Sequence, residues 1–188
     1  MAADRGFRGA GLMPIGQNIP QKSYQVKGLL TEAWAAYLQQ FSWDHYSTFT
    51  FRPITRAIGL NRTSVSFVHP ESVQKAIRRL TNELNKEIFG ERFWKRPHEG
   101  IIVAAAMERQ QSGNPHIHAL MGNIPASKRR MEIVDWWYQK QGIARVFEYK
   151  QGMGAEEYLS KLAYLFKDGK VEIDLLGPLE HYQPAPRF

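Results

Sequence analysis

Residues 101–121, IIVAAAMERQQSGNPHIHALM, carry the pattern that decides the fold of this chain. The apolar run at 101–107 is typical of a buried strand. Ser112, Gly113, Asn114 and Pro115 are residue types that favour a turn. Residues 116–121 then alternate between polar and apolar side chains, as a half-buried strand does. The stretch therefore predicts a β-hairpin with a long loop.

The segments around this hairpin alternate between strand-like and helical patterns. Strand patterns lie at 46–51, 143–149 and 171–176, and helical spacing lies at 29–41, 70–89, 127–141 (with Ser127 as N-cap) and 154–167. From residue 46 the order is β–α–β–β–α–β–α, which contains the split βαβ arrangement of ferredoxin-like folds. We expect an α+β fold: a ferredoxin- or RRM-like antiparallel sheet of about five strands, with helices packed on one face and the other face open.

The length of 188 residues suits one domain with extra arms. Residues 1–27 are rich in Gly, Pro and Gln without a period, which predicts a flexible N-terminal arm. Residues 28–176 are the predicted folded domain. Residues 177–188 contain several prolines and predict an extended C-terminal tail.

The composition favours a nucleic-acid partner. Lys and Arg outnumber Asp and Glu by 25 to 18, which gives a formal charge of +7 and attracts polyanions. The chain has no cysteine, so disulfides, thiolate metal sites and a cysteine nucleophile are excluded. No apolar run is long enough to span a membrane and no signal peptide is recognisable, so we expect a cytoplasmic protein without a membrane partner.

His116 and His118 lie two residues apart on the predicted strand. Side chains at this spacing point to the same side, so the two imidazoles lie together while Ile117 faces the core. Glu108 ends the preceding strand and lies opposite His116 across the hairpin. Two imidazoles and one carboxylate suit Mg²⁺ or Mn²⁺ and leave positions for phosphate and water. The alternative is two solvent-facing histidines, with Glu108 in a surface salt bridge.

The helical segment at 154–167 contains two Tyr-x-x-Lys units, Tyr158 with Lys161 and Tyr164 with Lys167. In each unit the lysine follows by one helical turn, where its charge favours the phenolate and stabilises negative charge. The two tyrosines face different ways, so one of them at most reaches a given metal ion. Tyr158 borders the apolar face that docks on the sheet, and we prefer it as nucleophile. The alternative for either is an amphipathic tyrosine at a helix border.

Basic and aromatic residues are interleaved at residues 92–96 (RFWKR). This mixture suits base stacking beside phosphate contacts. Further basic residues lie on the helical segment at 70–89, where a solvated helix face is the simpler explanation: Lys75, Arg78, Arg79 and Lys86.

The chain resembles the Rep-type HUH endonucleases over roughly residues 45–170. The matching motifs, in order, are Thr48-Phe49-Thr50-Phe51, the His-hydrophobic-His strand His116-Ile117-His118 and the helical Tyr158-Leu159-Ser160-Lys161. The spacing of Glu108 and His116 resembles that of the acidic ligand in geminivirus-like and circovirus-like Reps. Leu162 stands where two-tyrosine initiators have their second tyrosine, which points to a one-tyrosine type. Residues 164–169 (YLFKDG) resemble the geminiviral Tyr-x-x-Lys-Asp-Gly, which favours Tyr164 instead.

This resemblance implies a metal-dependent endonuclease that nicks single-stranded DNA at a replication origin, a hairpin being one possible form. It implies Mg²⁺ or Mn²⁺ on Glu108, His116 and His118, and a 5′-phosphotyrosine link to Tyr158 with Lys161 beside it. Such nickases start rolling-circle replication of a plasmid or virus with helicase or host replication proteins. An HUH transposase or mobilisation relaxase, and a non-catalytic RRM-like nucleic-acid-binding domain, remain as alternatives.

Overall fold

The computed structural model describes residues 21–57, 63–66, 68–96, 99–109, 114–163 and 173–177. Its centre is a five-stranded sheet in the order β6–β1–β5–β4–β7. The strands are β1 (His45–Phe51), β4 (Ile102–Arg109), β5 (Pro115–Gly122), β6 (Gly142–Glu148) and β7 (Ile173–Leu176). Every neighbouring pair is antiparallel, and β5 lies in the middle.

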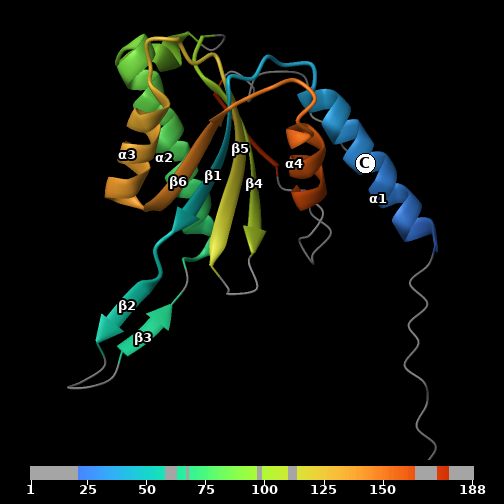
Figure 1. Ribbon diagram of the computed structural model, residues 1–188, viewed down its shortest axis with the longest axis horizontal. Coiled ribbons are helices and arrows are strands. Elements are labelled where there is room, and N and C mark those ends of the chain that lie inside the picture. Colours follow the sequence, from blue (N-terminus) through green and yellow to red (C-terminus); the bar gives the residue numbers. More distant parts are fainter. Residues whose placement is uncertain are drawn as a thin grey trace, which may run out of the picture.

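Four α-helices surround this sheet in the part of the chain that the structure describes (Figure 1). They are α1 (Gln21–Leu38), α2 (Pro70–Phe89), α3 (Arg130–Lys140) and α4 (Ala155–Ala163), and a 3₁₀ turn, η1 (Phe93–Lys95), follows α2. The short strands β2 (Ile54–Ala57) and β3 (Thr63–Ser66) form a separate hairpin that projects from the body. The predicted α+β fold with an antiparallel sheet of five strands is confirmed.

The helices cover both faces of the sheet, and not one face as the sequence suggested. One face packs on α2 and α3 through residues such as Val103 and Ile117, and the other packs on α1 and α4 through residues such as Ala104 and Leu120. The cause is the apolar run at 101–107, which places apolar side chains on both sides of β4. A strand that is apolar on both sides needs cover on both faces.

Several predicted boundaries are shifted, two of them at the starts of helices. Helix α1 begins at Gln21, so residues 21–27 of the predicted arm are helical. Helix α3 begins at Arg130 rather than after Ser127, because the Glu132 carboxylate accepts a hydrogen bond from the Arg129 backbone N–H at 3.2 Å and caps the helix there. The rest of the predicted arm, at 1–20, and the tail at 178–188 lie outside the described residues.

No helix within the described ranges has the length and apolar character that a membrane crossing requires.

Candidate active site

The central strand β5 carries His116 and His118 on the face that α1 and α4 partly cover. The partners in this face follow from the strand register: Glu108 of β4 pairs with His116, and Thr48 of β1 pairs with His118. Ile117 points the other way, into the core against α2 and α3. The predicted placement of Glu108 across the hairpin from His116 is therefore confirmed.

Both ring nitrogens of His118 have partners. Nε2 lies 2.9 Å from Glu108 Oε2, and Nδ1 lies 2.9 Å from the Tyr46 hydroxyl and 3.3 Å from Thr48 Oγ1. A carboxylate only accepts hydrogen bonds, so Nε2 of the neutral ring carries the proton and donates it to Glu108. Nδ1 then accepts from the Tyr46 hydroxyl. These contacts fix the rotation of the ring of His118, a residue that is only 7% exposed.

Burial keeps both imidazoles in the neutral form. Desolvation lowers the pKa of His118 below its ordinary value, although the hydrogen bond and charge of Glu108 act in the opposite direction. Desolvation also lowers the pKa of His116, and its neighbour His118 adds to that effect. Neutral imidazole is the form of histidine that can bind a metal ion.

Helix α4 docks beside these histidines because its apolar stripe meets small side chains of the sheet. Ala155, Leu159 and Leu162 are buried at helical spacing. They share a core with Ala104 and Ala106 of β4, whose short side chains let the helix approach closely. Tyr158 immediately precedes Leu159, so docking the stripe places its phenol at the border, over the histidine strand.

Tyr158 reaches the site. Its ring stands edge-on to that of His118, with 5.0 Å between centroids, and its hydroxyl donates to Glu108 Oε2 at 3.5 Å. The same carboxylate oxygen thus contacts both the imidazole and the phenol. Tyr158 is 38% exposed, which leaves the hydroxyl side accessible to a substrate.

The proton stays on the Tyr158 phenol. Desolvation raises the pKa of Tyr158 above its ordinary value, and the charge and hydrogen bond of Glu108 raise it further. The sequence predicts that Lys161 favours the phenolate, but the charge that acts on Tyr158 is that of Glu108, which favours the protonated phenol. Lys161 lies one turn after Tyr158 at an exposed position of α4. The competing candidates Tyr164 and Lys167 lie outside the described residues.

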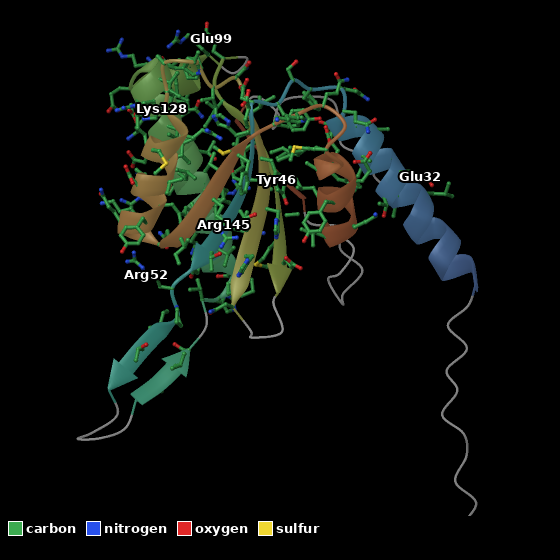
Figure 2. All side chains as sticks on the ribbon, in the orientation of Figure 1. Glu32, Tyr46, Arg52, Glu99, Lys128 and Arg145 are labelled. Carbon is green, nitrogen blue, oxygen red and sulfur yellow. The ribbon has the colours of Figure 1, made fainter. Side chains whose placement is uncertain are left out.

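Tyr46 is a site residue that sequence reasoning missed. It was assigned only to an alternating strand, yet it bonds to His118 and lies where the sheet faces α4 (Figure 2). Tyr46, Thr48 and Thr50 share one face of β1 at two-residue spacing. That alternation was the available signal, but the pairing of β1 with β5 was needed to bring the face to the histidines.

Two tyrosines near this face should make the protein sensitive to alkali. Burial raises the pKa of Tyr46 to about 12, and burial together with the hydrogen bond to Glu156 raises the pKa of Tyr149 to about 12. The unfolded chain loses these protons near pH 10, with a slope of at most ~1.4 kcal/mol per pH unit for each tyrosine. We therefore expect the unfolding free energy to be intact below pH 10 and to fall as the pH rises toward about 12.

Denaturant unfolding followed by circular dichroism at several pH values measures this loss. The Tyr149→Phe variant provides the matched comparison, because it removes one of the two ionisable phenols and should flatten the slope. An equal slope in the variant and the parent would contradict the assignment.

The donor chemistry of Glu108, His116 and His118 fits a divalent cation in kind. The Tyr46 contact at Nδ1 of His118 resembles the outer hydrogen bonds that orient metal-binding histidines. Within the described ranges, however, no three His, Asp or Glu side chains are positioned together as a metal-binding group. Glu108 instead bonds directly to His118 Nε2, the nitrogen that would bind the ion.

Comparisons of the chain with protein-family models, with curated proteins and with solved structures give no match. Function is therefore inferred from the site alone. The structure brings together four of the five predicted site residues: Glu108, His116 and His118 share one face of the sheet, and Tyr158 reaches them from α4. The fifth, Lys161, is an exposed residue of α4, one helical turn after Tyr158.

Proposed function

We propose that this chain is a one-tyrosine HUH-type endonuclease that nicks single-stranded DNA and remains joined to it through Tyr158. The observation that carries the proposal is the shared contact of Glu108 Oε2, 2.9 Å from His118 Nε2 and 3.5 Å from the Tyr158 hydroxyl. A phenol, a carboxylate and paired imidazoles are the groups that a phosphotyrosine transfer needs.

The reaction is a transesterification at phosphorus. The Tyr158 oxygen attacks the phosphate, a bond from phosphorus to the phenolic oxygen forms, and the bond from phosphorus to the 3′ oxygen breaks. The Glu108 carboxylate is placed to accept the phenolic proton, which ends on the departing oxygen as a free 3′-hydroxyl. The 5′ end stays on Tyr158, and no net proton or electron is consumed.

Lys161 supplies positive charge near the reacting group. It follows Tyr158 by one helical turn and is exposed, and we propose that its ammonium group attracts the scissile phosphate and offsets developing negative charge. Positioning and charge stabilisation are the main demands of phosphoryl transfer.

A Mg²⁺ or Mn²⁺ ion held by Glu108, His116 and His118 would polarise the phosphate when bound. Its binding would replace the hydrogen bond between His118 Nε2 and Glu108. The proton would then reside on Nδ1. Nδ1 would donate a hydrogen bond to the Tyr46 hydroxyl, which can act as donor or acceptor.

The Tyr46→Phe variant is expected to weaken cation binding by about 10- to 100-fold, because Nδ1 of His118 loses its oriented partner. Calorimetric titration with Mn²⁺ measures the change. Saturating Mn²⁺ should restore most of the nicking activity, since the nucleophile is retained. Unchanged Mn²⁺ affinity would show that Tyr46 has no part in orienting the ring.

The open part of the same sheet face offers a path for a single strand. On β6 the side chains of Ile143, Arg145 and Phe147 are exposed at two-residue spacing. Arg145 pairs with Thr48, which in turn pairs with His118. The basic side chain of Arg145 and the apolar side chains on either side of it therefore lie on the same face as the histidines. Figure 2 shows Arg145 on β6, away from α4. Exposed aromatic and basic groups in this arrangement suit stacked bases and phosphates.

The test is incubation of the purified chain with labelled single-stranded oligonucleotides and Mn²⁺. We expect a covalent adduct that resists denaturation, and mass spectrometry should assign the nucleotide to a peptide containing Tyr158. Sequences drawn from candidate origins, transposon ends and transfer origins separate the replication initiator from the transposase and relaxase alternatives. Absence of an adduct with every class of substrate would reject the covalent mechanism.

A second candidate function is non-catalytic binding of single-stranded nucleic acid on the sheet. It is favoured by the exposed Phe147, which is 50% accessible and lies two residues from the exposed Arg145 on β6. This candidate predicts oligonucleotide binding that is indifferent to Mn²⁺ and to Tyr158→Phe.

A further inference from the structure

A groove of about 720 Å³ lies between α2, η1 and the end of β7. Helix α2 packs its apolar stripe, Val73, Ile77, Leu80 and Leu84, on the face of the sheet opposite to His118. The groove is therefore separate from the site at Tyr158. Glu99, which lines the groove, lies at the top of the view in Figure 2, near one end of α2.

The wall formed by α2 is strongly basic. Its lining residues follow helical spacing on the side away from the core: Lys75, Arg78, Arg79, Asn82 and Lys86. The row from Lys75 to Lys86 extends about 16 Å along the helix. Arg96 also lines the groove but is paired with Glu99 at 2.5 Å, which leaves the four cations of α2 against the carboxylate of Glu83. This excess suits a ligand that carries several negative charges in a row.

The opposite wall presents an aromatic ring. Trp94 of η1 is 66% exposed although it lines the groove. Its segment is held in place, because Arg96 Nη2 donates to the Phe89 carbonyl at the end of α2 at 2.6 Å, and Phe93 is partly buried. The Lys95 ammonium lies 5.2 Å from the centroid of this ring, and the rest of the exposed indole is available for stacking beside that charge.

We propose that this groove binds a second segment of single-stranded DNA, with phosphates along α2 and a base stacked on Trp94. A single strand fits better than a duplex, because an indole face stacks on unpaired bases, and a charged groove with stacking rings is the usual design for single strands. The choice of DNA over RNA rests on the proposed function, but the inference that the groove binds a single strand does not. A strand held here and at Tyr158 contacts both faces of the sheet.

The test is fluorescence anisotropy with a labelled oligothymidylate in EDTA, which measures binding without nicking. We expect Lys75→Glu with Arg79→Glu to weaken binding by about 10- to 100-fold, and Trp94→Ala by about 10-fold. The control is Arg130→Glu with Lys140→Glu on α3, which also changes exposed residues and lowers the formal charge from +7 to +3. An equal loss in the control would attribute the effect to net charge and overturn the proposal.

Photochemical cross-linking with a halogenated oligonucleotide gives an independent readout. Cross-links to the peptide that contains Trp94 support the groove, whereas cross-links confined to β1, β5, β6 and α4 reject it. Equal affinity for a duplex and a single strand would also reject it. Because both measurements omit the metal and can use Tyr158→Phe, they remain informative if the covalent mechanism fails.

Discussion

Replacing Tyr158 with phenylalanine is expected to abolish the covalent adduct and to lower nicking on the order of 10⁴-fold or more. The substitution removes the Tyr158 hydroxyl, which donates to Glu108 Oε2, but keeps the ring that contacts His118. The fold should therefore be retained while the attacking atom is lost. The rate of adduct formation on denaturing gels, with circular dichroism as a check of folding, measures both effects.

Tyr138→Phe is the matched control for this substitution. Tyr138 is an exposed tyrosine on α3, and its ring faces Arg52 and not the histidine strand, so its loss should leave nicking unchanged. Tyr164→Phe must be tested beside it. Full activity in Tyr158→Phe together with an inactive Tyr164→Phe would transfer the role to Tyr164.

The second large effect is expected from the groups proposed to hold the cation. His118→Ala and Glu108→Gln should each weaken Mn²⁺ binding by at least about 100-fold. Loss of a residue that only hydrogen-bonds to a metal ligand already weakens binding by about 10- to 100-fold, and these two substitutions alter a proposed ligand itself. Nicking should fall in parallel. Electron paramagnetic resonance of free and bound Mn²⁺ measures the affinity without a substrate.

His69→Asn is the control for a lost histidine. His69 caps α2 by accepting from the Glu71 backbone N–H, and asparagine preserves that role. Mn²⁺ affinity should stay at the parental value. If His118→Ala and Glu108→Gln both bind Mn²⁺ as the parent does, the cation does not occupy this site and the metal assignment is wrong.

Much of the fold could be predicted because the strands of the central hairpin are neighbours in sequence. The alternation in residues 116–121 and the turn before it determine that Glu108 faces His116, with no information from the rest of the chain. The distribution of the helices could not be predicted in this way. Periodicity shows that α4 has one apolar side, but it does not show which face of a sheet that side covers.

The helix starts were less predictable than the helices themselves. Ser127 has the residue type of an N-cap, but the cap that forms is set by Glu132 at Arg129. Both signals are present within a few residues, and residue type alone does not rank them.

By itself, the sequence determined that two imidazoles share one side of a strand, that a carboxylate stands opposite them and that a phenol borders a helical stripe. These features follow from the periods of strand and helix, which any chain of this sequence must obey. Only the tertiary structure decided that α4 lies over the histidine face and that Tyr46 holds His118 at Nδ1. Those contacts join strands and helices far apart in the chain, and long-range packing, not local pattern, selects their register.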